Sequence, residues 1–109
     1  MEYKNRTFKL FGETWKIVYQ KGISLPGDTE TMGMHHFGIT SGAEHTIYVN
    51  LLNSNGKPAT KETIESTLRH ELVHAIFGSG QYLSCSDDEP LVEWTGKCIG
   101  ELIRQNVFP

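Results

Sequence analysis

The first half of the chain alternates apolar and polar side chains, which is the pattern of half-buried β-strands. Residues 7–11 and 14–19 alternate in this way on either side of a turn at Gly12, and this predicts a β-hairpin. Residues 36–40 and 45–51 predict a second hairpin, joined by a turn at residues 41–44. Between the two hairpins, residues 22–34 are rich in glycine and also contain proline, aspartate and threonine, so we expect a loop there.

The period of the apolar positions changes after a turn-rich break at residues 53–58. Thr60 is the expected N-cap of a helix, because apolar residues recur at helical spacing from Ile64 to Ile76. Gly78 and Gly80 are expected to end this helix.

A second helix is expected to begin near residues 86–89. Ser86 and Glu89 form a capping-box pattern there, and Pro90 falls in the first turn, where proline is tolerated. The apolar stripe of this helix consists of Leu91, Trp94, Cys98 and Leu102. Strands that precede helices predict an α+β fold, in which the helices pack on one face of a small mixed or antiparallel sheet. We expect the large aromatic side chains to lie in its core, namely Phe8, Phe11, Trp15 and Trp94.

Length and charge limit the classes of function. A chain of 109 residues fits a single domain, so residues 1–109 are interpreted as one unit. The formal net charge of −3 argues against a nucleic-acid-binding protein, and no apolar run is long enough for a membrane span.

Cys85 and Cys98 are too few for a disulfide framework, so we expect reduced thiols, with a single bridge or metal ligation as the alternatives. With no apolar segment of a signal peptide near the N-terminus, we expect a cytoplasmic protein.

The chemistry is carried by the HExxH motif of residues 70–74, which falls inside the first predicted helix. His70 and His74 lie one helical turn and about 40° apart, so both imidazoles can reach one metal ion. Glu71 is at the edge of the same face, close to such a metal without having to bind it. The alternative is a pair of histidines on an ordinary amphipathic helix, with Glu71 paired to a neighbouring residue.

A catalytic zinc site needs a third protein ligand. The extended pattern HExxHxxGxxH is absent, so a carboxylate on the second helix is the expected source. Glu93 is the best candidate, because Gly96 and Gly100 on its side of the helix would let the two helices approach closely. Two alternatives remain open: Glu93 belongs to a surface ladder with Lys97 and Glu101, or Glu89, one turn earlier, is the ligand rather than a helix-capping acid.

These residues resemble a known family. The motif of residues 70–74, followed by a helix that bears Glu93, resembles the zincin metallopeptidases of the gluzincin kind. The order of elements is similar to that of the minimal gluzincins and of small phage and mobile-element metallopeptidases related to the ImmA/IrrE group. The resemblance implies that His70, His74 and Glu93 bind one Zn²⁺ and that Glu71 is the general base in the hydrolysis of a protein or peptide substrate. It also implies that a strand around residues 36–40 or 45–51 pairs with extended substrate.

Other interpretations of the same motif remain. The chain could be a zincin-fold binding or regulatory module without turnover, or an enzyme whose site is covered by residues 22–34 or by the tail of residues 106–109. The donor that would stabilise an oxyanion is also open, with His36 and Tyr82 as the first candidates among His35, His36, His45, Tyr48 and Tyr82.

Overall fold

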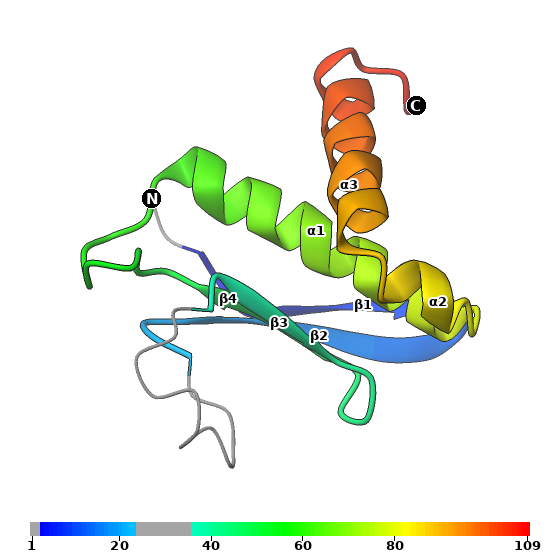
Figure 1. The fold of residues 1–109 in the computed structure, drawn as a ribbon, viewed down its shortest axis with the longest axis horizontal. Helices are drawn as coiled ribbons and strands as arrows, with labels where there is room; N and C mark the ends of the chain where they lie inside the picture. Colours follow the sequence, from blue (N-terminus) through cyan, green and yellow to red (C-terminus); the bar gives the residue numbers. More distant parts are fainter. Residues whose placement is uncertain (1–2, 24–35) are drawn as a thin grey trace.

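A computed structural model describes residues 3–23 and 36–109. Four strands are followed by three helices (Figure 1). They are β1 (Arg6–Leu10), β2 (Glu13–Gln20), β3 (Gly38–Ser41), β4 (Thr46–Asn50), α1 (Lys61–Ser79), α2 (Leu83–Ser86) and α3 (Glu89–Arg104). The predicted α+β class is confirmed, with all the strands before the helices.

The strands form one mixed sheet in the order β1-β2-β4-β3. The hairpins β1–β2 and β3–β4 are antiparallel, as expected, whereas β2 and β4 pair in parallel and join the two hairpins. This order makes β3 an edge strand, with β4 as its partner in the described residues. The position of β3 is important because it borders the site described below.

The turn between β1 and β2 has two consecutive residues with positive φ. Phe11 has φ 50° and Gly12 has φ 84°, which is the pattern of a type I′ hairpin turn. Glycine adopts this conformation without steric cost, but phenylalanine does not. Phe11 is also 95% exposed, so the expectation that it belongs to the core is wrong.

The core lies between the sheet and α1, which crosses one face of the sheet (Figure 1). Trp15 from β2 and Ile47 and Val49 from β4 pack with Ile64 and Ala75 from α1. Phe8, Leu68 and Leu72 pack against this cluster from its margin. The expected apolar side of α1 is therefore confirmed from Ile64 to Ala75, whereas Ile76 is 46% exposed and does not belong to the core. The opposite side of the helix faces away from the sheet.

The helix ends follow the capping rules, with one difference from the sequence prediction. Thr60 is the N-cap of α1, and its hydroxyl accepts a hydrogen bond from the backbone N–H of Thr63. The N-cap of α3 is Asp88, whose carboxylate accepts from the N–H of Leu91, and not Ser86. Ser86 instead ends the short helix α2, which the sequence pattern did not predict.

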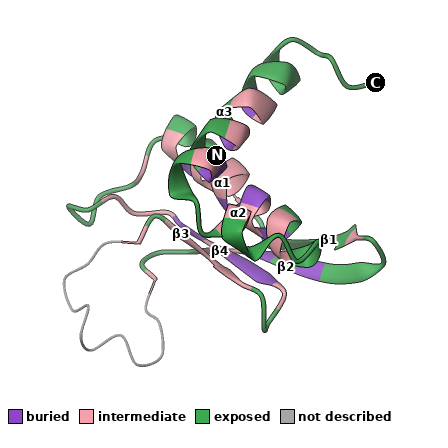
Figure 2. Ribbon diagram, turned by 45° about the vertical axis from the view of Figure 1, so that its right-hand side comes forward, coloured by how far each residue is buried: buried purple, intermediate pink, exposed green. Residues whose placement is uncertain are grey.

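Helix α3 packs on α1 through small side chains. Its buried residues are Val92, Gly96 and Gly100, spaced four apart along one face. A Cβ atom on Gly96 would lie 3.5 Å from the backbone nitrogen of His70, so the expected close approach of the two helices is confirmed. Beyond this contact α3 leads away from the sheet, and its outer end is exposed (Figures 1 and 2). Trp94 is 65% exposed, so its predicted place in the core is also wrong.

Among residues 3–23 and 36–109, no helix has the length and apolar character needed to cross a membrane.

Candidate metal centre

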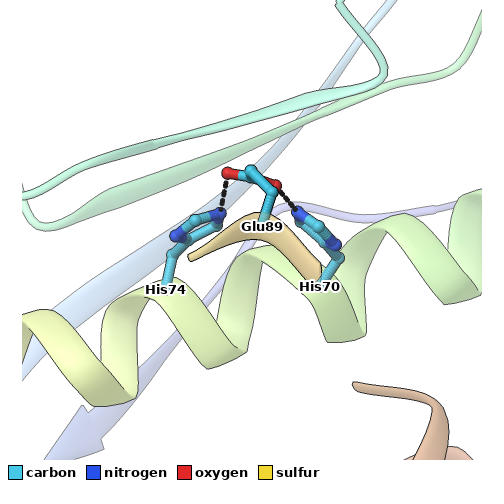
Figure 3. A group of neighbouring side chains, drawn as sticks. All are labelled: His70, His74 and Glu89. Carbon is cyan, nitrogen blue, oxygen red and sulfur yellow. Dashed lines mark hydrogen bonds and ion pairs between the residues drawn. The ribbon is translucent and has the colours of Figure 1, made fainter. Parts of the chain in front are cut away.

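The two histidines of the motif lie on the side of α1 that faces α2 and α3. Their side chains are 20% exposed for His70 and 16% for His74, and their ring centroids are 5.1 Å apart. Both rings turn one nitrogen, Nε2, toward the same point above the helix (Figure 3). The partial burial expected from the apolar flanks of the motif is therefore present.

Glu89, in the first turn of α3, occupies that point. Its Oε2 lies 2.9 Å from Nε2 of His70, and its Oε1 lies 3.1 Å from Nε2 of His74. One carboxylate thus bridges two imidazoles, as Figure 3 shows. One ligand atom from each of these three residues falls within 4.8 Å of the others, which is close enough for a shared cation.

Glu93 lies on the other side of His70. Its Oε1 is 3.8 Å from Nδ1 of His70, the nitrogen that points away from Glu89. The structure thus brings Glu89, the second choice from the sequence, into the group with both histidines. It places Glu93, the first choice, beside only one of them.

A second contact holds the outer nitrogen of His74. The Nδ1 atom of His74 lies 3.0 Å from the hydroxyl oxygen of Ser86, at the end of α2. When Nδ1–H donates to this hydroxyl, Nε2 carries the lone pair and faces the centre of the group. Metal-binding histidines commonly have such an outer partner, which fixes the tautomer and the ring orientation.

Glu71 points to the opposite side of the cleft and contacts the sheet. It is only 7% exposed, and its Oε1 accepts a hydrogen bond of 2.7 Å from the hydroxyl of Thr40 on β3. Burial raises the pKa of the Glu71 carboxyl above its ordinary value, although the Thr40 hydrogen bond and the nearby His74 and His70 act in the opposite direction. A carboxylate with a raised pKa is better matched to proton transfer near neutral pH than a solvated one.

These groups line a cleft of about 840 Å³. Helix α1 forms its floor, residues 36–40 form one wall, and the ends of α2 and α3 form the other. Of the two candidates for an oxyanion donor, His36 lines the cleft, whereas Tyr82 does not. His35 and residues 24–34 of the expected covering loop lie outside the described residues, and the tail of residues 106–109 does not line the cleft.

The donor set of His70, His74 and Glu89 suits zinc. Two imidazole nitrogens and one carboxylate oxygen are the ligands of many catalytic zinc sites, which keep a fourth position for water or substrate. The ordered Nδ1 partner of His74 and the open cleft above the group agree with such a site. The residues present therefore fit a bound zinc ion.

Sequence reasoning found His70, Glu71, His74 and both glutamates, but it missed Ser86 and Thr40 as parts of the site. Ser86 carried only a helix-capping signal, and Thr40 only a strand signal. Their contacts depend on how α2 and β3 sit against α1, which no local pattern encodes.

Comparison of the chain with protein-family models, with curated proteins and with solved structures finds no match in any of the three.

Proposed function

We propose that this protein is a zinc-dependent peptidase that hydrolyses peptide bonds with a metal-activated water. One observation carries the proposal: Nε2 of both motif histidines converges on one carboxylate, while the buried Glu71 stands beside them in an open cleft. A purely structural metal site would not need the second, buried carboxylate. The resemblance of residues 70–74 to the zincin motif supports the same assignment.

In this proposal His70, His74 and Glu89 hold the zinc ion. Glu89 replaces Glu93 as the proposed third ligand, because only Glu89 contacts Nε2 of both histidines. Glu93, at 3.8 Å from the outer nitrogen of His70, would orient that ring. Ser86 performs the corresponding function for His74.

The chain's own chemistry centres on Glu71. A zinc ion bound in this position would lower the pKa of a water molecule and polarise the carbonyl of a peptide. The Glu71 carboxylate accepts the proton of the attacking water and then delivers it to the leaving amine. The hydroxyl of Thr40 holds this carboxylate in place.

The substrate would be an extended peptide lying along β3. This strand is at the edge of the sheet and lines the cleft next to Glu71. A peptide that adds a strand to such an edge is recognised through its main chain, so its sequence can vary.

The first test concerns the ligands. The zinc content of the purified protein is compared with that of His74→Ala, Glu89→Ala and Glu93→Ala variants after dialysis against the same free zinc concentration. We expect about one zinc per wild-type chain, its loss in the first two variants, and retained but weaker binding in Glu93→Ala. Loss of zinc in Glu93→Ala with retention in Glu89→Ala would overturn the assignment of Glu89.

The second test concerns catalysis. Zinc-loaded wild type is incubated with a diverse peptide library, and cleavage is followed by mass spectrometry beside Glu71→Gln. We expect Glu71→Gln to keep its zinc and to lose activity by about 10²-fold or more, since it removes the general base. Equal cleavage by the two proteins would contradict the role of Glu71, and no cleavage by either would favour a zinc-holding binding module.

A further inference from the structure

Helix α3 and the residues that follow it expose an unusual amount of apolar surface. Ten large apolar side chains are exposed within the described residues, and five of them lie on this segment: Trp94, Leu102, Ile103, Val107 and Phe108. Scattered apolar residues are normal on protein surfaces, but apolar residues that gather on one side of an element indicate an interaction site. Trp94 and Leu102 lie on one side of α3 in this way, whereas Ile103 lies on the side of Gly96 at about 100° per residue.

The exposed Trp94 and Leu102 and the half-buried Cys98 between them form a stripe on the side of α3 away from the face that packs on α1. The buried face is marked by Val92, Gly96 and Gly100. Trp94, Cys98 and Leu102 repeat with the same spacing of four residues. At about 100° per residue, Trp94 and Cys98 lie about 160° around the helix from Gly96, and Leu102 lies about 120° from it. The helix therefore has two apolar faces, and α1 covers only one of them.

We propose that the outer face of α3 binds the same face of a second copy of this chain, with the two helices antiparallel and the two-fold axis at Cys98. An isologous contact of this kind requires a self-complementary surface. The stripe meets that requirement, because Trp94 and Leu102 are equally distant from Cys98 in the sequence. Trp94 of each copy then faces Leu102 of the other, and the smaller Cys98 faces itself at the axis.

The charges beside the stripe favour the antiparallel orientation over the parallel one. Lys97 and Glu101 both border the stripe on the same side of the helix, about 40° apart. In an antiparallel pair about Cys98 these edges meet, and Lys97 lies two residues along the axis from Glu101 of the second copy, twice by symmetry. These two opposite-charge pairs outnumber the single pair of Lys97 side chains at the same separation. In a parallel two-fold pair the same edges lie on opposite sides of the contact, so these charges do not meet. Within the part of the chain that the structure describes, Lys97 has no ion-pair partner of its own. Such rim pairs add little affinity but discriminate between orientations.

The mass of the protein in solution tests the dimer. We expect twice the chain mass of 12.3 kDa by sedimentation equilibrium. Trp94→Gln should raise the dissociation constant by about tenfold or more, as expected for a central aromatic residue. The matched control is Phe11→Asn, which also replaces an exposed aromatic residue by an amide but lies on the β1–β2 turn, and it should leave association unchanged.

Both variants replace exposed side chains, so circular dichroism should show an unchanged fold. A monomer at all concentrations up to about 100 μM, well above the typical range of specific interfaces, overturns the proposal. Equal dissociation constants for wild type and Trp94→Gln also overturn it.

The register is tested by oxidation of a cysteine. Helices packed about 8–10 Å apart bring directly facing Cα atoms to roughly 3.5–5.5 Å, which overlaps the range of a disulfide. With Cys85→Ser as background, a mild added oxidant should therefore link Cys98 to Cys98 and give a covalent dimer. The reciprocal variant, Cys98→Ser with Cys85 retained, should remain uncrosslinked. Absence of the Cys98 crosslink in a protein that is dimeric by mass would overturn the antiparallel register.

The orientation is tested by charge changes in separate chains. Lys97→Glu and Glu101→Lys should each weaken self-association, because each places like charges across the axis. An equimolar mixture of the two variants should associate more tightly than either alone, because both cross-pairs then have opposite charges. No gain on mixing would contradict the proposed contact. None of these measurements depends on the metal site or on peptidase activity.

Discussion

Ser86 contacts the nitrogen of His74 that faces away from Glu89, and we expect this contact to strengthen metal binding. Removing an outer partner of a metal-binding histidine typically reduces affinity by about 10–100-fold. We therefore predict a loss of that size in the zinc affinity of Ser86→Ala, measured by competition with a chromophoric chelator. Ser84→Ala is the matched control, since Ser84 is an exposed serine of the same short helix. Equal affinities of the two variants would contradict this role of Ser86.

If the proposed mechanism is correct, we expect Thr40 to affect catalysis rather than metal binding. Its hydroxyl donates to Oε1 of the Glu71 carboxylate, whereas the side-chain hydrogen bonds described for His70 and His74 go to Glu89 and Ser86. Thr40→Val keeps the shape of the side chain but removes the donor, so we predict that kcat falls by about tenfold, the value of one hydrogen bond to a charged group. Thr40→Ser should restore kcat, and zinc content should be the same in all three proteins. A Thr40→Ser variant as slow as Thr40→Val would exclude the hydroxyl as the cause.

The choice between Glu89 and Glu93 shows where inference at the residue scale ends. The motif spacing places His70, Glu71 and His74 because all three lie on one rigid helix. The two glutamates are one turn apart on a different helix, and either could face the histidines. Which one does depends on the direction in which α3 leaves its N-cap at Asp88, and therefore on the turn made by α2. That turn was not predicted from the sequence.

At the scale of elements, the contact between β3 and α1 depends on Gly38. A Cβ atom at this position would lie 2.7 Å from Cγ2 of Thr67, 2.9 Å from Cγ of Glu71 and 3.1 Å from the backbone oxygen of Tyr48. We predict that Gly38→Ala lowers the free energy of unfolding by about 1–3 kcal/mol, the usual cost of overpacking. Urea unfolding measures this change.

The matched control for Gly38 is Gly42, in the turn between β3 and β4, where a Cβ atom would meet no other atom within 4 Å. Gly42→Ala should change stability little. If overpacking is the cause, combining Gly38→Ala with Thr67→Ser, which removes the nearest methyl group, should recover part of the loss. A loss of equal size in Gly42→Ala would mean that glycine is needed for reasons other than space.

Elements were predicted well where a local pattern defines them. The alternation about Gly12 and the cap at Thr60 located β1, β2 and α1, since period and capping are encoded within a few residues. The parallel pairing of β2 with β4 was left undecided, because it joins strands separated by more than twenty residues. The apolar stripe of α3 was recognised, but half of it proved to be exposed: helical periodicity shows that a face is apolar and does not show which neighbour covers it.

At the scale of the whole molecule, the candidate metal centre joins α3 to the rest of the fold. His70 and His74 belong to α1, which packs on the sheet, whereas Glu89 begins the helix that leads away from it. The buried residues of α3 are Val92, Gly96 and Gly100, and the two glycines have no side chain with which to bury apolar area. A metal ion bound by both helices would therefore add a substantial part of the attachment of α3.

This arrangement predicts that zinc stabilises the whole domain. A ligand that binds only the folded chain at about 100 times its dissociation constant contributes about 2.7 kcal/mol. For a domain of this size each kcal/mol raises Tm by about 4–8 °C, so zinc should raise Tm by about 10–20 °C. Differential scanning calorimetry at one fixed protein concentration measures the shift, and a chelator should reverse it.

Glu89→Ala should lose most of the shift at the same free zinc concentration, because the ion would then contact α1 alone. A shift of full size in Glu89→Ala would mean that zinc binds without linking the helices, and that α3 is held on α1 by packing.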